Sequence, residues 1–129
     1  MFWRLHMAKT VLVVDDDVLI LKILNLIFST NGFKVLEAAN GQEALEVLDS
    51  RKKNIDLIIT DFNMPAINGL ELANAVRIHK KHNKTPLILI TSDTRITRSS
   101  EHYNVFNEII HKPFPSELIL NKADVLISK

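Results

Sequence analysis

Apolar and polar positions along this chain follow two alternating patterns. Five short runs of apolar and β-branched residues are typical of buried strands, and the longer segments between them carry apolar residues three or four positions apart, as helices do. The predicted strands are 10–14, 33–38, 56–60, 86–91 and 107–111. The predicted helices are 17–30, 41–48, about 69–82 and 116–127. Strands that are apolar throughout and alternate with helices indicate a doubly wound α/β fold, a parallel sheet covered on both faces.

The starts of two helices are marked by side chains that can cap them. Asp17 is expected to cap the first helix, and Asn40 with Glu43 forms an asparagine version of the capping box before the second. The first helix contains the longest apolar run, 18–28, which is too short to cross a bilayer. We expect this helix to be buried over much of its circumference.

Polar side chains follow the apolar strands at the points where the strands end. In the stretch LIITDFNMPAINGLEL, Asp61 follows a buried strand, and the chain then turns sharply into a helix. The carboxyl ends of parallel strands lie at one edge of the sheet, and ligands bind there in such folds. The side chains expected at this edge are those of Asp15, Asp16, Asp61, Thr91, Ser92 and Lys112.

This set of side chains suits the transfer of a phosphoryl group. Carboxylates that lie close together repel one another unless one is protonated or a cation binds, and oxygen ligands favour Mg²⁺, Mn²⁺ or Ca²⁺. An ammonium and a hydroxyl beside such a cation suit the oxygens of a transferring phosphoryl group. A carboxylate can itself be the nucleophile and form an aspartyl phosphate. We therefore expect Asp61 to be exposed at the sheet edge, on the turn after its strand, where it can react.

Composition excludes several other kinds of function. The chain has 129 residues, 47% of them hydrophobic and 24% charged, which is ordinary for one globular domain. The net charge of +1 provides no large basic field for nucleic acid or for an anionic membrane surface. The absence of cysteine excludes disulfides, thiolate metal sites and cysteine nucleophiles, and it fits the reducing cytoplasm.

Each side chain at the predicted edge has an ordinary structural explanation when it is taken alone. A single Asp after a strand is usually a turn former, and Thr91 or Lys112 alone would be a strand-end residue or a loop lysine. Their joint placement at one edge is what favours a site. His79 and His82 have helical spacing, but no further ligand accompanies them. We expect them to complement the helix dipole, as the basic residues of 50–54 do for the preceding helix.

These residues resemble the receiver domain of bacterial response regulators, the phosphoacceptor part of two-component signalling. The matching segments are VLVVDDD at 11–17, DLIITDFNMPAINGLEL at 56–72, PLILITS at 86–92 and HKPF at 111–114. They follow the family's order and approximate spacing, and the resemblance covers essentially all of residues 8–129. It implies a flavodoxin-like, five-stranded parallel sheet with the strand order 2-1-3-4-5. Residues 1–7 are expected to be an N-terminal extension, because Met7 opens a natural-looking start.

The resemblance also assigns roles to the acidic residues at the sheet edge. Asp61 matches the family's phosphorylated aspartate. Asp15 and Asp16 match the acidic pair that holds Mg²⁺ together with Asp61, and the backbone carbonyl of Asn63 matches a further ligand. The implied cofactor is Mg²⁺.

Four other positions match residues that handle the phosphoryl group in the family. Thr91 matches the hydroxyl residue that contacts the phosphoryl group, and Lys112 matches the lysine that forms an ion pair with it. The peptide bond between Lys112 and Pro113 is expected to be cis, as it commonly is in the family. Asn63 and Ser92 match the positions that tune the lifetime of the phosphoryl group.

Two features depart from the family pattern. Ile109 stands three positions before Lys112, where the family usually has an aromatic residue that is coupled to the hydroxyl residue during activation. The segment 93–108 is rich in Ser, Thr and Asn, which are mediocre helix formers, and lacks the small Gly–Ala step usual before the fifth strand. We expect its helix to be short or displaced. We also expect the segment 94–107, rather than the side chain of Ile109, to change on phosphorylation.

The leading hypothesis for function is a phosphorylation switch. A sensor histidine kinase or a phosphotransfer protein would donate to Asp61, and the changed surface would engage a downstream protein or a fused output domain. Direct contact of this domain with nucleic acid or membrane is not expected. The chain would then be a signalling phosphoacceptor and not an enzyme.

Two other hypotheses remain open. The first is an Mg²⁺-dependent hydrolase with an aspartyl-phosphate intermediate. Phosphatases of the dehalogenase type, however, need an acid where this chain has Asn63, and they usually carry a cap insertion. The second is a receiver-like interaction module that does not use phosphorylation, against which the acidic pair, Thr91 and Lys112 argue.

Overall fold

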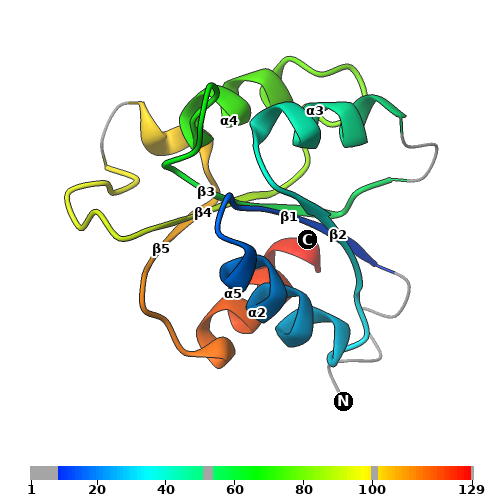
Figure 1. The fold of residues 1–129 in the computed structure, drawn as a ribbon, viewed down its shortest axis with the longest axis vertical. Coiled ribbons are helices and arrows are strands. Elements are labelled where there is room, and N and C mark those ends of the chain that lie inside the picture. The colour runs from blue at the N-terminus through cyan, green and yellow to red at the C-terminus, as the bar shows by residue number, and fades with distance from the viewer. Residues whose placement is uncertain (1–8, 51–53, 100–101, 129) are drawn as a thin grey trace.

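The computed structural model describes residues 9–50, 54–99 and 102–128. Within these residues the chain forms one five-stranded parallel sheet with the strand order β2-β1-β3-β4-β5 (Figure 1). The predicted fold class and strand order are therefore confirmed. The strands are β1 (Thr10–Val14), β2 (Lys34–Ala38), β3 (Leu57–Asp61), β4 (Leu87–Thr91) and β5 (Glu108–His111).

Helices cover both faces of the sheet (Figure 1). Helices α3 and α4 lie on one face, and α2 and α5 lie on the other. A short 3₁₀ turn, η1, precedes β5. The bounds are α2 (Val18–Ser29), α3 (Gly41–Ser50), α4 (Gly69–Arg77), η1 (Tyr103–Val105) and α5 (Ser116–Ile127).

Residues of the central strands alternate between two hydrophobic cores. In β1, Leu12 and Val14 pack with α3 and α4, whereas Val11 and Val13 pack with α2 and α5. All five residues of each of β1, β3 and β4 are buried. This two-sided burial explains why these strands are apolar throughout rather than at alternate positions.

The strand register brings the carboxyl ends of four strands together. Val14 at the end of β1 pairs with Thr60 in β3, Asp61 at the end of β3 pairs with Ile90, and Thr91 pairs with His111. The residues that directly follow these positions therefore lie along one edge of the sheet.

Helix α2 corrects one prediction about burial. Only Leu21, Leu24 and Phe28 are buried, so the helix is not buried over much of its circumference as the sequence suggested. It packs against the sheet and α5, and apolar side chains elsewhere on its surface remain exposed. The exposed apolar side chains of this helix are those of Val18, Leu19, Ile23 and Leu26.

Helix α4 ends at Arg77, five residues before the predicted end. The turn that follows makes its own hydrogen bonds. Nδ1 of His79 accepts the backbone N–H groups of Lys81 and His82 at 3.1 and 3.3 Å. The Arg77 guanidinium also donates to the carbonyl of Thr85 at 2.7 Å. The amides of Lys81 and His82 thus bond to the His79 ring and not to carbonyls of a preceding helical turn.

The segment between β4 and β5 lacks a regular helix in its described residues, 92–99 and 102–107. Only the turn η1 is present, as the composition of the segment predicted. The buried side chains of Ile96 and Phe106 attach it to the core of the α3–α4 face. Arg98 Nε donates to the carbonyl of Phe106 at 3.0 Å.

The predicted helix caps are present. The Asp17 carboxylate accepts the backbone N–H of Leu19 at 2.9 Å, and the Asn40 side chain accepts that of Glu43 at 2.8 Å. The Glu43 carboxylate accepts the backbone N–H of Ala39. No helix among the described residues is long and apolar enough to span a membrane.

Candidate functional site

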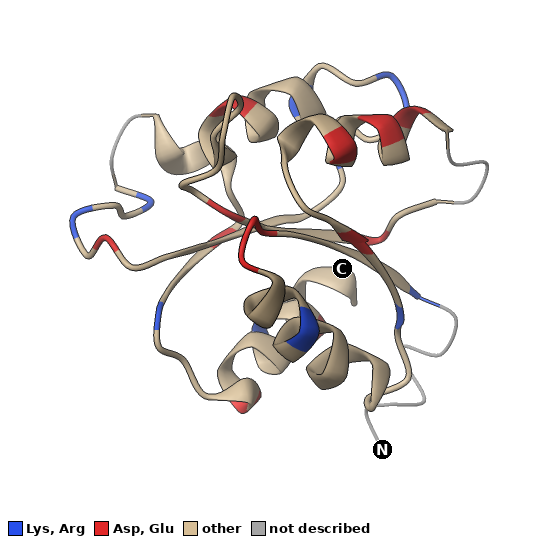
Figure 2. Cartoon of the chain, viewed as in Figure 1, with Lys and Arg blue, Asp and Glu red and all other residues tan. Residues whose placement is uncertain are grey.

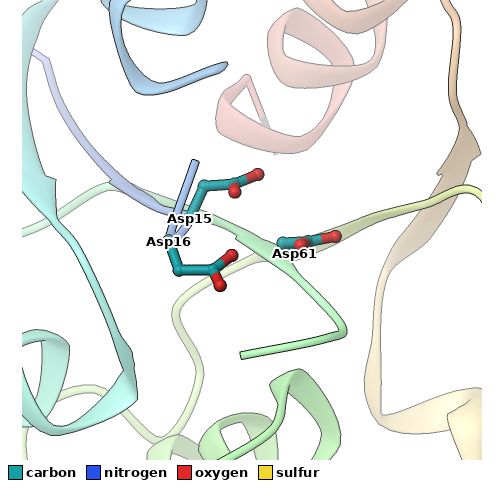
Figure 3. A group of neighbouring side chains, drawn as sticks. All are labelled: Asp15, Asp16 and Asp61. Atoms are coloured by element: carbon teal, nitrogen blue, oxygen red, sulfur yellow. The ribbon is translucent and has the colours of Figure 1, made fainter. Parts of the chain in front are cut away.

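Three carboxylates meet at the carboxyl edge of the sheet (Figure 3). Asp15 and Asp16 directly follow β1, and Asp61 is the last residue of β3. One oxygen of each lies within 4.8 Å of the others. The convergence predicted for these three residues is therefore present, because β1 and β3 are neighbours in the sheet.

Asp15 is the most deeply buried member of this carboxylate group. Its side chain is fully buried, and Oδ1 accepts the backbone N–H of Asp17 at 2.8 Å. Oδ2 lies 3.5 Å from Nζ of Lys112 but has no hydrogen-bond partner among the described residues. Burial raises the pKa of Asp15, and the charge of Asp61 adds to the rise, against the lowering effects of the Asp17 amide and Lys112.

Lys112 supplies the positive charge at this edge. Its Nζ donates to Oδ1 of Asp61 at 3.2 Å, and its backbone N–H donates to the carbonyl of Thr91 at 2.8 Å. The peptide bond between Lys112 and Pro113 is cis, as expected. Lys112 follows β5, and its ammonium reaches past the end of β4 to form ion pairs with both Asp61 and Asp15.

The remaining predicted residues lie around this group with different exposures. Thr91 is buried at the end of β4, and its Oγ1 accepts the backbone N–H of Asp93 at 3.1 Å. Ser92 and Asn63 are exposed on the loops after β4 and β3. The edge thus combines the buried side chains of Asp15, Asp61 and Thr91 with exposed polar side chains, among them those of Asp16, Asn63 and Ser92.

The environment of Asp61 differs from the expectation. The sequence predicted an exposed carboxylate on the turn, yet Asp61 belongs to β3 and is 8% exposed. The Lys112 ammonium and the neighbouring carboxylates lie beside it, so Asp61 is a buried residue at a strand end rather than an exposed residue of the turn.

Gly69 was not identified from the sequence as part of the site. Its backbone N–H donates to the carbonyl of Phe62 at 2.8 Å, and a Cβ at this position would lie 2.3 Å from the backbone oxygen of Asp61. Only glycine lets the start of α4 approach the end of β3 this closely. The dipeptide NG at 68–69 predicted a turn but not this contact.

The two histidines after α4 do not form a site of the same kind. His82 is 1% exposed, and its Nδ1 lies 3.2 Å from the Thr85 hydroxyl. Burial lowers its pKa, and the charges of His79 and Lys81 lower it further, so the expected role as a cation at a helix end is wrong for His82. The basic residues 51–53 lie outside the described residues.

The acidic edge has the composition of a site for a hard divalent cation. Acidic residues occupy the loop after β1 and the end of β3 (Figure 2). All donors are oxygens, and Oδ2 of Asp15 is buried without a hydrogen bond, which is costly unless a cation compensates for it. The residues present therefore fit such a cation.

Comparisons with known proteins agree with this geometry. The family model for the response regulator receiver domain matches residues 11–124. The transcriptional regulatory protein SrrA of Staphylococcus aureus is 33% identical over 122 residues, covering 93% of this chain. The chain spans about half the length of this curated relative, 48%.

Solved structures of receiver proteins share the fold. The response regulator TrrA of Thermotoga maritima, in complex with Mg²⁺ and BeF, is 35% identical, with a TM-score of 0.81 over 92% of this chain and 98% of that one. The chemotaxis response regulator CheY4 of Vibrio cholerae is 30% identical, with a TM-score of 0.82 over 93% of this chain and 99% of that one. The chain belongs to the response regulator receiver domain family of two-component signalling.

Proposed function

We propose that this receiver domain accepts a phosphoryl group on Asp61 from a phosphohistidine and so switches an interaction surface. The observation that carries the proposal is the position of the Asp61 carboxylate. It is largely buried beside two further carboxylates, and its Oδ1 is 3.2 Å from the Lys112 ammonium. A carboxylate in such a setting can act as a nucleophile while the ammonium stabilises the transferred charge.

The transfer exchanges one bond to phosphorus for another. An oxygen of Asp61 attacks the phosphorus atom, the new O–P bond forms, and the N–P bond to the donor imidazole breaks. The electron pair of that bond stays on the imidazole nitrogen. Lys112 and the Thr91 hydroxyl are the proposed contacts for oxygens of the transferred group. The Thr91 oxygen accepts the Asp93 amide, and its proton can still be donated to the phosphoryl group.

Asp15, Asp16, Asp61 and the backbone carbonyl of Asn63 are the proposed ligands of Mg²⁺. The bound ion would neutralise charge on the phosphoryl oxygens during transfer. Asp15 supports this assignment through its buried oxygen without a hydrogen bond, and Asp16 supports it through its exposed carboxylate beside that oxygen. The exposed side chains of Asn63 and Ser92 lie on the loops that follow Asp61 and Thr91, so we assign them an influence on how long the phosphoryl group persists.

A sensor histidine kinase or a phosphotransfer protein is the proposed donor. A groove of about 410 Å³ beside the site is lined by Ile20, Ile23, Ile27, Lys112 and Phe114, among others. Lys112 belongs both to this groove and to the carboxylate site, and Ile23 belongs both to the groove and to the exposed apolar face of α2. An apolar helix of a phosphohistidine-bearing domain could pack on this face while the histidine reaches Asp61.

The output is proposed to be a protein interaction rather than catalytic turnover. We take residues 8–129 as the receiver domain and propose that a downstream protein or a fused output domain responds to its phosphorylation. Direct contact with nucleic acid or membrane is not part of this function. The same proposal implies a cytoplasmic location, which the absence of cysteine fits.

Acetyl phosphate provides a direct test without the unknown kinase. Wild type and the Asp61→Asn variant are incubated with acetyl phosphate and Mg²⁺, and their intact masses are measured. We expect the wild type to gain one phosphoryl group and the variant to gain none. Equal phosphorylation of both proteins would exclude Asp61 as the acceptor. Continuous Mg²⁺-dependent release of phosphate from phosphomonoesters would instead favour a hydrolase.

A further inference from the structure

Phe62 connects the acceptor strand to the segment between β4 and β5. It directly follows Asp61 in the chain, and its ring contacts that of Tyr103 in η1, with centroids 6.0 Å apart and a tilt of 55°. Both rings are partly buried against the core of the α3–α4 face. A displacement of the backbone at Asp61 therefore acts on η1 through packed rings.

His111 makes a second connection, from the other end of the site. It directly precedes Lys112 in the chain, and its Nε2 lies 2.9 Å from the carbonyl oxygen of Ile96. Because a carbonyl only accepts, Nε2 must carry the proton of this hydrogen bond. The Ile96 side chain is buried, and the Ile96 amide donates to the carbonyl of Asp93 at 3.2 Å.

The hydrogen bond of His111 closes a ring of contacts around Thr91. The Thr91 hydroxyl accepts the Asp93 amide, the Asp93 carbonyl accepts the Ile96 amide, and the Ile96 carbonyl accepts His111. Thr91 is paired with His111 across β4 and β5. A shift of the Thr91 side chain toward a phosphoryl group on Asp61 would lengthen the first of these bonds and so loosen the ring.

We infer that Phe62 and His111 couple the carboxylate site to the segment 92–107. Each is the chain neighbour of a site residue, and each contacts a different part of that segment, Phe62 at η1 and His111 at Ile96. The coupling rests on the proposed phosphorylation of Asp61 and specifies how that event changes the surface. The branched, stiff side chain of Ile109 is unsuited to switch between two states and so transmit the change. The contacts of Phe62 and His111 transmit it instead.

The test follows two backbone amides that report the two connections separately. The Ile96 amide reports the loop after β4, and the Phe106 amide, which donates to the carbonyl of Tyr103 at 3.2 Å, reports η1. Their hydrogen exchange is measured by NMR with Mg²⁺ alone and with Mg²⁺ and beryllofluoride, which stands in for the phosphoryl group. Fluorine NMR measures the binding of beryllofluoride independently.

Three variants separate the two connections. Tyr103→Leu removes the ring contact without touching the carboxylate site, and His111→Leu removes the hydrogen bond. His111→Gln keeps an N–H donor at that position and should restore the bond. Ile78→Ala, at a side chain that is 85% exposed after α4, is the matched control.

We expect beryllofluoride to change the exchange rates of both amides in the wild type and in the control by a few-fold. Tyr103→Leu should lose the response at Phe106 and keep it at Ile96. His111→Leu should lose the response at Ile96 and keep it at Phe106, and His111→Gln should regain it.

Two outcomes would overturn this coupling although beryllofluoride binds. One is an unchanged response in both leucine variants, and the other is a wild type whose two amides do not respond. Failure of beryllofluoride to bind the wild type would instead contradict the proposed function itself.

Discussion

Asp15 shows how a single side chain can be unfavourable for folding and still suit a function. Its carboxylate is fully buried, only one of its oxygens accepts a hydrogen bond, and burial raises its pKa above the ordinary value of 3.8. The native protein therefore holds a proton on Asp15 at pH values where the unfolded chain has lost it. When Asp15 is ionised, the ammonium of Lys112 at 3.5 Å compensates its buried charge only in part, and a bound cation would relieve the rest.

The pH dependence of stability without metal should expose this cost. Because the native pKa of Asp15 is raised, its unfavourable contribution is absent below pH 3.8, develops as the pH rises through the native pKa, and is complete above it. We expect Asp15→Asn to be more stable than the wild type at neutral pH without Mg²⁺, and to lose less stability between pH 4 and pH 7. Chemical denaturation at several pH values measures both effects.

Asp16→Asn is the matched control for Asp15→Asn, because Asp16 belongs to the same carboxylate group but is exposed. It removes one carboxylate from the group and leaves the buried Asp15 in place, so the effect of Asp15 on stability should be retained. A wild-type slope retained in Asp15→Asn would mean that another group is responsible.

The exposed surface of helix α2 suits the docking of a phosphoryl donor better than it suits the stability of the domain alone. Its inner face carries the buried Leu21, Leu24 and Phe28, whereas Ile23 and Leu26 on the outer side remain exposed. Removing exposed apolar area from water is favourable, so this face gains free energy when a partner covers it. Its position beside the groove that reaches Lys112 places such a partner next to Asp61.

A charge on this face should separate the two classes of phosphoryl donor. Ile23→Glu places a carboxylate on the surface where a protein donor would pack, at a side chain that is already 43% exposed. We expect transfer from a phosphohistidine-bearing protein to slow by about tenfold or more, which corresponds to on the order of 1.4 kcal/mol. Phosphorylation by acetyl phosphate should remain unchanged.

Val125→Glu, on the exposed face of α5, is the control for a general effect of charge. Equal slowing by both variants, or slowing with acetyl phosphate as well, would argue against donor docking on α2.

At the scale of the molecule, the parallel sheet gathers residues that are far apart in the sequence. Asp15, Asp61 and Lys112 follow or end three strands and meet at one edge because those strands run in the same direction. The same arrangement brings the three carboxylates of Asp15, Asp16 and Asp61 together, and the ammonium of Lys112 lies beside two of them. The gathered carboxylates therefore give the folded protein an affinity for a cation that the unfolded chain, in which they are far apart, lacks.

Mg²⁺ should therefore stabilise the whole domain. A ligand that binds only the native state adds RT ln(1 + [L]/Kd) to the free energy of unfolding. Millimolar Mg²⁺ with a comparable Kd should thus add about 0.5–1 kcal/mol. Melting temperatures with and without Mg²⁺ measure the effect, and Asp16→Asn should weaken it. A melting temperature that does not depend on Mg²⁺ would contradict a metal site at this edge.

Much of this arrangement could be predicted from the sequence, because apolar runs specify buried strands and parallel strands align their carboxyl ends. The gathering of Asp15, Asp61 and Lys112 followed from that rule. The end of α4 at Arg77 did not, because the residues after the helix form a turn in which the His79 ring accepts the backbone amides of Lys81 and His82. The contact of Gly69 with Asp61 is likewise a tertiary approach without a pattern in the chain.

Burial was the property that sequence patterns described least well. The apolar face of α2 remains exposed because no neighbouring element covers it, and periodicity alone cannot show whether a neighbour exists. The opposite error occurred at Asp61 and His82, which are polar yet buried. In both cases the surroundings come from other elements, so only the assembled fold determines them.

The central claim is that Asp61 itself becomes phosphorylated, and chemical trapping tests it most directly. The protein is incubated with acetyl phosphate and Mg²⁺, the acyl phosphate is reduced with borohydride to homoserine, and the modified position is found by tandem mass spectrometry. The account predicts homoserine at position 61, absent when Mg²⁺ is removed by a chelator. Homoserine at Asp15 or Asp16, or none at position 61 in a protein that has gained a phosphoryl group, would contradict it.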